Sequence, residues 1–390
     1  PLTSDVLLNG PINRVLPSYF DELDETMIFK SASMTKGSGG PMRTDAEQYR
    51  RILTSNKYKK ENRDLRVQLA IFAQNLATQH LDPNSLEAFV SCRLIPLDKN
   101  PGVRPIGIGE TTRRIVGKCI SWILRKDIQH AAGPLQTATG LQGGAEAAIH
   151  SMKLIFENEG TDGVILVDAS NAFNSLNRNA ALHNIRILCP QFSTILINTY
   201  RLPVRMFIQG GGEILSVEGT TQGDNLAMSF YALGISILLD RLKISSPNTH
   251  QVGLADDITG AGKIHDLKLW WDTIIMEGRK VGYYVNETKS WLIIKDEEKL
   301  RHAQNIFNET GIKFTCEGKR HLGAVIGSNE FKSEYIREKV DIWIEEIERL
   351  TEYSKTQPHA AYAIFCRGVL HEYTYLMRTI HGFDEYMKPI

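Results

Sequence analysis

Three carboxylates carry the most specific chemical signal in the chain. Asp256 and Asp257 are adjacent in a segment that is expected to form a short turn, and Asp168 directly follows the apolar run Gly163–Val167. Such a run predicts a buried strand, and the residues on both sides of the Asp pair predict the arms of a hairpin. Two neighbouring strand ends that present three carboxylates could hold two Mg²⁺ ions ~4 Å apart, which is the arrangement that clamps the attacking and leaving oxygens of a phosphoryl transfer.

An Asp-Asp pair in a hairpin also has a purely structural interpretation. Asp accepts left-handed backbone conformations and bonds its own backbone, so it is common in turns. Against this, carboxylates grouped so closely repel one another unless a cation is present, and the grouping itself favours a metal site. The pair alone leaves both interpretations open, and the motifs around it discriminate between them.

Six short motifs occur in order between about residue 41 and about residue 327, and together they resemble a reverse transcriptase. Each motif is weak by itself, and it is the shared order and spacing that indicate the family. The motifs are a fingers loop at 99–106, Asp-x-x-x-Ala-Phe at 168–173, Gly-x-x-Gln-Gly at 219–223, Ala-Asp-Asp at 255–257, Gly-x-x-x-Asn-x-x-Lys at 282–289 and Leu-Gly at 322–323.

Two features place the resemblance nearer non-LTR and group II intron-like enzymes than retroviral ones. Residues 139–145 resemble the Gln/Gly segment that precedes the first catalytic strand in non-retroviral retroelement enzymes, and the stretch 104–168 is longer than in retroviral enzymes. Two departures stand against the family pattern. The Asp-Asp turn begins with Leu254 where most members have an aromatic residue, and Ala227-Met228 replaces the usual Ser-Pro.

The resemblance implies an α+β fold shaped like a right hand, with fingers, a palm and a helical thumb. In such enzymes the palm is an antiparallel sheet of split βαβ character backed by helices. From Gly163 onward the chain itself alternates between strand-like and helix-like segments, which is typical of a helix-backed antiparallel sheet. The expected domains are an N-terminal extension or linker at 1–40, fingers at 41–160 (mostly helical, around a loop at 96–109), a palm at 161–327 with a fingers insertion near 179–205, and a thumb at 328–390.

Several local patterns give finer expectations. Residues 1–40 look irregular and end in a Gly/Ser-rich connector. Thr44 and Glu47 form a capping-box pattern that predicts the start of a helix. Residues 316–319 predict the turn of a hairpin. An apolar stripe from Ile336 to Leu350 predicts a helix that begins at about residue 333, and a second helix is expected from about residue 359 to 380.

The resemblance assigns the carboxylates to a site for two Mg²⁺ ions, for which Mn²⁺ can substitute. It implies that Asp168 and Asp256 contact both metals, that Asp257 is an auxiliary ligand, and that Ala169 completes the metal site. In this family a metal lowers the pKa of the primer 3′-hydroxyl and neutralises charge on the departing pyrophosphate.

The resemblance also implies residues that bind the incoming deoxynucleotide. Phe173 would pack under the sugar and exclude a 2′-hydroxyl, with a core aromatic residue beside a strand as the alternative. Lys99 and Arg104 would hold the triphosphate, and a surface cation on a Gly/Pro loop is the alternative for each. Lys289 would donate a proton to the pyrophosphate, and a strand-end lysine is its alternative.

Further residues would contact the nascent base pair and the primer. Gln222 offers hydrogen bonds and Gly223 lets backbone approach the substrate closely. Contacts to the primer backbone give affinity without base specificity and predict a strong dependence of binding on salt. The residues implied for primer and template are Lys319, Arg320, His321, Leu322 and Gly323.

Composition limits the class of protein. The chain has 390 residues with 45 basic and 45 acidic side chains, so bulk charge does not indicate a nucleic-acid binder. The segment 93–127 nevertheless has eight basic residues against three acidic ones, which would suit a duplex-holding surface; a solvated amphipathic helix at 111–126 is the alternative. The cysteines and the apolar runs limit the compartment. Five scattered cysteines are typical of an intracellular, reducing compartment, and their spacing argues against a zinc site. No apolar run is long enough to span a bilayer, and the start at Pro1 indicates a piece of a longer product.

Three candidate functions follow. The first is an RNA-dependent DNA polymerase of a retroelement, with an RNA template, a DNA or RNA primer, dNTPs and further domains of a polyprotein as partners, and no membrane. The second is an RNA-dependent RNA polymerase with the same palm, which Phe173 disfavours. The third is a catalytically silent nucleic-acid-binding scaffold, which the presence of all three carboxylates disfavours. The element type, the template RNA and the priming mechanism stay open.

Overall fold

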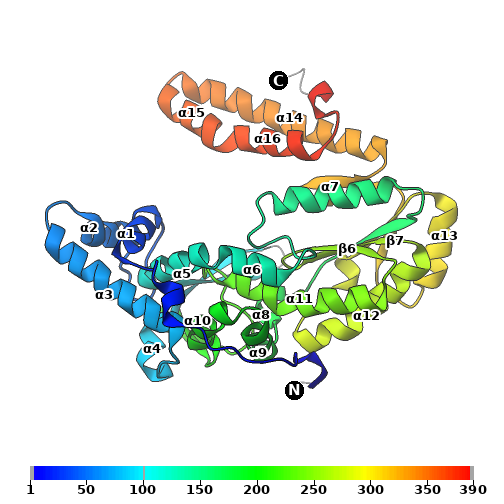
Figure 1. Ribbon diagram of the computed structural model, residues 1–390. Coiled ribbons are helices and arrows are strands. Elements are labelled where there is room, and N and C mark those ends of the chain that lie inside the picture. The colour runs from blue at the N-terminus through cyan, green and yellow to red at the C-terminus, as the bar shows by residue number, and fades with distance from the viewer. Residues whose placement is uncertain (1–3, 100–101, 387–390) are drawn as a thin grey trace. The chain divides into compact units, whose positions relative to one another are not determined.

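The computed structural model describes residues 4–99 and 102–386, and the chain divides into two compact units (Figure 1). Unit 1 comprises the residues up to Gln142 together with Ala169–Arg241 and Thr273–Tyr284. Unit 2 comprises Gly143–Asp168, Leu242–Asp272 and the residues from Val285 onward. Helices and strands occur in both units, which confirms the α+β class.

Parts of some predictions lie outside the described residues. These are Asn100 and Pro101 in the expected fingers loop, and residues 1–3 and 387–390 at the ends of the expected terminal domains. Within the residues that are described, every helix is too short or too polar to cross a membrane.

Unit 2 is built on a five-stranded sheet with the strand order β6-β7-β3-β8-β9. The central strand β3 (Gly163–Val167) pairs antiparallel with β7 (Asp257–Gly262) and with β8 (Trp291–Ile294). β6 (His250–Leu254) forms a hairpin with β7, and β9 (Lys313–Thr315) runs parallel to β8. β3 is apolar and almost wholly buried, as a strand covered on both faces must be.

Helices cover the two faces of this sheet. α7 (Gly144–Glu157) lies along β6 and β7, as Figure 1 shows. On the other face, the ring of Trp270 from α12 (Ile264–Val281) lies directly over Gly260, where an added Cβ would be 3.0 Å from the ring. The cluster under α7 consists of Ala148, Met152, Phe156, Val164, Val252, Ala261, Ile293 and Ile326.

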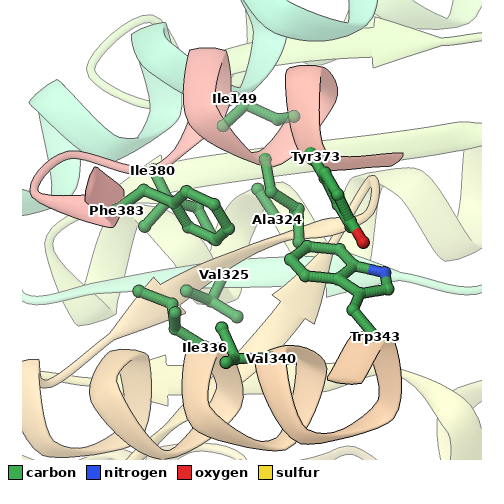
Figure 2. Close-up of a cluster of buried hydrophobic side chains, with 10 residues drawn as sticks. Ile149, Ala324, Val325, Ile336, Val340, Trp343, Tyr373, Ile380 and Phe383 are labelled. Carbon is green, nitrogen blue, oxygen red and sulfur yellow. The ribbon is translucent and has the colours of Figure 1, made fainter. Parts of the chain in front are cut away.

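The C-terminal part of unit 2 joins a small hairpin to a pair of long helical segments. The hairpin is β10 (Gly318–His321) with β11 (Ala324–Gly327), and the helices are α14 (Asn329–Ser354), α15 (Pro358–Ile364) and α16 (Leu370–Thr379). A π-helical segment, Phe365–Val369, connects the last two. Figure 2 shows their shared core, in which Trp343 meets Tyr373 edge to face at 4.4 Å between ring centroids.

The prediction of a hairpin turn at 316–319 is wrong by several residues. The turn lies at Leu322 and Gly323, which have φ values of 49° and 86°. Two successive positive φ values are what a two-residue turn of type I′ requires, and the Gly at its second position meets that need. The segment before Cys316 instead pairs with β8 in the main sheet.

Unit 1 combines helices with a second sheet of order β2-β1-β4-β5. Its strands are β1 (Cys92–Asp98), β2 (Val103–Gly109), β4 (Val204–Ile208) and β5 (Glu213–Ser216). Its helices are α1 (Glu25–Met34), α2 (Ala46–Thr54), α3 (Lys59–Thr78), α4 (Pro83–Val90), α5 (Thr111–Ile123), α6 (Arg125–Ala132), α8 (Ala172–Ser175), α9 (Arg178–Leu188) and α10 (Pro190–Tyr200), with most of α11 (Ala227–Ser245). The helix α13 (Glu297–Ile306) belongs to unit 2.

Three local expectations in unit 1 are corrected by the structure. Residues 1–40 are not wholly irregular, because Asp24 caps α1 by accepting a hydrogen bond from the backbone nitrogen of Met27. The capping box of α2 is formed by Asp45 and Gln48, one residue later than the Thr44/Glu47 pattern predicts. The loop at 96–109 is the hairpin of β1 with β2, paired from Cys92↔Gly109 to Asp98↔Val103.

Candidate functional site

Asp168 and the Asp256-Asp257 pair lie at the same edge of the five-stranded sheet. The antiparallel pairing of β3 with β7 ends at Val167↔Ile258, and one further step in this register brings Asp168 opposite Asp257. In the β6–β7 hairpin, Leu254 pairs with Asp257, so the two residues between them form the turn. Sheet pairing therefore brings together three carboxylates from segments 88 residues apart in the chain.

The turn between β6 and β7 has a strained backbone. Ala255 has a φ of 56°, a conformation that residues other than Gly rarely adopt. Positive φ inside a two-residue hairpin is usual, but Gly, Asn or Asp normally takes that position. Ala255 is buried, so a larger or polar side chain has little room there. Strain held in this way is often found where a neighbouring side chain must be aimed.

The strand end at Asp168 is anchored by the segment before β8. The backbone nitrogen of Asp168 donates to Ser290 Oγ at 3.0 Å, and its carbonyl oxygen accepts from the backbone nitrogen of Asn286 at 2.7 Å. The backbone of Asp168 is therefore fixed while its carboxylate is exposed. Lys289 is three residues after Asn286, in the short helix Glu287–Lys289, and its side chain is exposed.

The carboxylates interact electrostatically. Desolvation by surrounding groups, followed by the charges of Asp256 and Asp168, raises the pKa of Asp257 to about 6. Desolvation is the larger cause, and the like charges of Asp256 and Asp168 add to it. The group thus carries an unfavourable repulsion that a bound cation would relieve.

Carboxylate oxygens are the hard ligands that Mg²⁺ prefers, so the donor chemistry of these residues fits a magnesium site. Their present arrangement is looser than a closed metal site. Within residues 4–99 and 102–386, no three His, Cys, Asp or Glu side chains converge closely enough to hold a metal ion. A metal would have to draw the three side chains together. Ala169 follows Asp168 directly in the sequence and begins the next segment of unit 1.

In unit 1, the Gln222-Gly223 step lies against the β1–β2 hairpin. The backbone nitrogen of Gly107 donates to the carbonyl oxygen of Gln222 at 2.8 Å. Gly223 has a φ of 109°, and a Cβ added there would lie 2.6 Å from the carbonyl oxygen of Gly107. Both the conformation and the close approach therefore require glycine at this position.

The two cations expected to hold a triphosphate lie near the tip of that hairpin. Arg104 pairs with Leu97, and the backbone nitrogen of Lys99 donates to the carbonyl oxygen of Gly102 at 3.0 Å. Both side chains are exposed. The structure thus places Lys99 and Arg104 on the same element, and the Gln222 contact ties that element to the neighbouring loop.

Phe173 is half-buried at the start of α8. It is therefore neither a fully buried core residue nor a fully exposed side chain. Its ring stacks on Tyr231 from α11, with centroids 4.4 Å apart and an interplanar angle of 16°. Its carbonyl oxygen accepts from the backbone nitrogen of Thr220 at 2.6 Å. One face of the ring is therefore supported by a buried aromatic residue.

The residues expected at the primer differ sharply in their surroundings. Arg320 is exposed, whereas the ammonium of Lys319 lies 3.6 Å from the ring centroid of Trp291. His321 is only 6% exposed, and burial lowers its pKa to about 4, so the imidazole is neutral at physiological pH. Leu322 and Gly323 form the turn itself. Of the three charged or titratable side chains, Arg320 is the one placed to meet a phosphate.

The sequence did not reveal a buried charged network in unit 1. Arg113 and Asp224 form an ion pair at 2.6 Å between Nη2 and Oδ2, and Tyr200 donates to the same oxygen at 2.6 Å. Because Arg113 is buried, neither of the two interpretations of the basic segment, a duplex-holding surface or a solvated amphipathic helix, describes this position of α5. Arg114 and Lys118 also donate to backbone carbonyl oxygens, those of Lys36 and Met34. The one available signal was an arginine among the apolar residues of that helix.

Comparisons with known proteins give only distant similarities. No protein-family model matches the chain, and a search of curated proteins finds no match. Among solved structures, 14% sequence identity is shared with telomerase from Candida tropicalis in three states: apo and truncated from the C-terminal domain (TM-score 0.42), in complex with a TWJ fragment of telomeric RNA (0.43), and apo (0.46).

These alignments are partial. They cover 53%, 54% and 63% of this chain and 50%, 41% and 48% of the respective telomerase chains. This chain therefore spans half or less of the structures it is similar to. At TM-scores below 0.5 the similarities do not show a family.

Proposed function

We propose that the chain is an RNA-dependent DNA polymerase of the retroelement type, which extends a primer 3′-hydroxyl with deoxynucleotides. The observation that carries the proposal is the edge of the five-stranded sheet, where the register of β3 with β7 brings Asp168 beside Asp257 and the strained turn at Ala255 presents Asp256. The order of the sequence motifs supports the same activity.

Asp168, Asp256 and Asp257 would hold two Mg²⁺ ions, with Ala169 completing the site. When bound, these ions supply Lewis-acid activation of the primer hydroxyl and charge neutralisation on the triphosphate. The chain's own contribution is to hold the carboxylates in place. The backbone bonds of Asp168 to Ser290 and Asn286 do this on one strand, and the short hairpin turn does it on the other.

The remaining roles follow the resemblance residue by residue. Arg104 and Lys99 would bind the triphosphate through charge-assisted hydrogen bonds, and Lys289 would protonate the leaving pyrophosphate. Phe173 would exclude ribonucleotides, and Gln222 with Gly223 would contact the nascent base pair. The primer backbone would meet the hairpin that consists of Lys319, Arg320, His321, Leu322 and Gly323, with Arg320 as its exposed cation.

A second candidate is a nucleic-acid-binding scaffold without catalytic activity. One observation favours it: among the described residues, the carboxylates do not already converge as ligands of a metal ion. The grouping of Asp168, Asp256 and Asp257 at adjacent strand ends favours the polymerase, because a scaffold gains nothing from three carboxylates that repel one another.

Primer extension distinguishes these candidates. The chain is given Mg²⁺, a primer on an RNA template or on a matched DNA template, and either deoxynucleotides or ribonucleotides. Extension on RNA with deoxynucleotides supports the proposal. Extension with ribonucleotides alone would identify an RNA polymerase. Salt-sensitive binding of the template without extension in any arm would identify the scaffold, because phosphate contacts survive without catalysis.

A further inference from the structure

A buried charged network in unit 1 lies beside the loop that contains Gln222 and Gly223. The side chains of Arg113 and Asp224 are 4% and 3% exposed and form an ion pair at 2.6 Å. Tyr200 is fully buried, and its hydroxyl donates to the same carboxylate oxygen at 2.6 Å. Burying two charges has a large desolvation cost, so this ion pair adds little net stability, whereas removal of one partner alone would be strongly destabilising.

The network bonds the loop to the helices around it. The backbone nitrogen of Thr221 donates to the Tyr200 hydroxyl at 3.4 Å, and that of Leu226 donates to Asp224 Oδ1 at 3.2 Å. Arg113 Nη1 in turn donates to the carbonyl oxygen of Val90 at 2.6 Å, at the end of α4. Both ends of the segment Thr221–Leu226 are therefore fixed by one buried carboxylate and its partners.

The loop is in turn pressed against the β1–β2 hairpin. A Cβ on Gly107 would lie 2.4 Å from Thr221 Cγ2, and a Cβ on Gly223 would lie 2.6 Å from the Gly107 carbonyl oxygen. The hydrogen bond from the backbone nitrogen of Gly107 to the carbonyl oxygen of Gln222 holds the loop and the hairpin together. A shift of the loop therefore cannot be absorbed locally and must move the hairpin that contains Arg104.

We propose that Asp224, held by Arg113 and Tyr200, is a positioning residue that sets the affinity for the incoming nucleotide. It acts through the loop at Gln222 and through the hairpin. The nucleotide part of this inference rests on the proposed polymerase function; the mechanical coupling between loop and hairpin does not.

The test uses Tyr200→Phe in the full chain, because removing Asp224 would leave the charge of Arg113 buried without its partner. Tyr200→Phe keeps the ion pair and the ring, which contacts Phe230 at 4.9 Å between centroids, and removes only the hydroxyl. The control is Tyr19→Phe, which removes a hydroxyl bonded to Asp127 at 2.5 Å, also in unit 1 but at an exposed position that none of these bonds reaches.

Two quantities are measured: amide hydrogen exchange in peptides covering 103–109 and 219–226, and the KM for a deoxynucleotide in primer extension. Tyr200→Phe removes the hydrogen bond that the hydroxyl donates to Asp224 and the one that it accepts from the backbone nitrogen of Thr221. This loss predicts at least about fivefold faster exchange in both segments and a KM raised at least about fivefold, with kcat within about twofold. Tyr19→Phe should change neither. A merely structural role would lower the melting temperature without this split between KM and kcat.

Three results would overturn the inference: faster exchange confined to 219–226, equal effects in Tyr19→Phe, or an unchanged KM with faster exchange. If the unmodified chain does not extend a primer, the polymerase proposal and the nucleotide role both fail. The exchange of 103–109 then still decides whether the network couples the loop to the hairpin.

Discussion

The hydroxyl of Tyr375 donates a 2.5 Å hydrogen bond to the carbonyl oxygen of Leu322 and so joins α16 to the turn of the β10–β11 hairpin. Tyr335 on α14 does the same for Gly323, at 2.9 Å. Two tyrosines on different helices therefore hold a turn in which both residues have positive φ values. The hairpin proposed to meet the primer is fixed from the side of the C-terminal helices.

Tyr375→Phe should loosen this turn. The loss of one half-buried hydrogen bond is worth about 1 kcal/mol. The left-handed conformation of Leu322 favours relaxation of the turn once the bond is gone. We expect a free energy of unfolding lower by about 1 kcal/mol and an affinity for a primer–template duplex reduced by about fivefold. Urea denaturation and duplex binding measure the two. Tyr353→Phe, at an exposed position on α14, is the control and should leave both values unchanged.

His321 should give the chain a pH-dependent stability. Burial lowers the pKa of His321 from 6.5 to about 4, so the folded chain binds this proton less readily than the unfolded chain. The contribution is complete above about pH 6.5 and is lost as the pH falls toward about 4. At about 1.4 kcal/mol per pKa unit it amounts to about 3 kcal/mol.

The measurement is urea denaturation between pH 7.5 and pH 4. His321→Phe should flatten the loss of stability with falling pH relative to the unmodified chain. His371→Phe, at an exposed position on α16, should keep the original slope. Equal slopes in all three proteins would show that His321 titrates normally and is not buried as described.

Phe173→Val should weaken the preference for deoxynucleotides. The change removes ring volume on the side of Phe173 that Tyr231 does not support. A pocket that loses steric exclusion of this size changes discrimination by about 10–100-fold. The ratio of kcat/KM for a deoxynucleotide to that for the matching ribonucleotide measures it. Tyr231→Phe keeps the aromatic stack and should leave the ratio nearly unchanged; the gate assignment fails if the ratio is also unchanged in Phe173→Val.

Gly223→Ala should destabilise the chain more than Gly210→Ala, although both glycines have similar positive φ values. Gly210 has a φ of 104°, close to the 109° of Gly223, but nothing lies within 4 Å of a Cβ added there. Gly210→Ala therefore pays only for the conformation, about 1–2 kcal/mol. Gly223→Ala also forces the backbone of Gly107 away, which should cost about 1 kcal/mol more and raise the KM for nucleotide. Comparable losses in both variants would mean that the loop and hairpin are not in firm contact.

The sheet could be predicted because its signals are local. The apolar run at 163–167 and the two arms around Asp256 predict strands, and the structure pairs them as a hairpin and its neighbour. The register that brings Asp168 beside Asp257 is a consequence of that pairing. The clustering of the carboxylates was thus accessible from the sequence once the strands were recognised.

The β1–β2 hairpin was missed because prolines normally argue against strands. Pro96 and Pro105 lie opposite each other in this hairpin. β1 pairs with β4 only over Cys92–Leu94, so the missing N–H of Pro96 costs no bond to that neighbour. Pro96 is tolerated in β1 because the pairing with β4 ends before it, and the local sequence around Pro96 gives no information about where that pairing ends.

The Arg113–Asp224 pair could not be predicted for a different reason. The two residues are 111 positions apart. An arginine among apolar residues was a signal, but the helix contains Arg113, Arg114 and Lys118, and the sequence does not show which of these cations is buried. Burial of Arg113 depends on the long-range packing of α5, α10 and the loop that follows β5. The same applies to His321, whose neighbours Lys319 and Arg320 made the whole segment look exposed.

The most direct test of the central claim is primer extension on an RNA template by Asp256→Asn beside Asp272→Asn, in the presence of Mg²⁺ and deoxynucleotides. Asp272 is an exposed carboxylate on α12, paired with Lys268 at 2.6 Å, and has no part in the proposed site. Activity in the unmodified chain and in Asp272→Asn, with a loss of at least about 1,000-fold in Asp256→Asn and template binding retained, is the predicted result. Equal extension by Asp256→Asn and Asp272→Asn would contradict the assignment of the carboxylates as the catalytic centre.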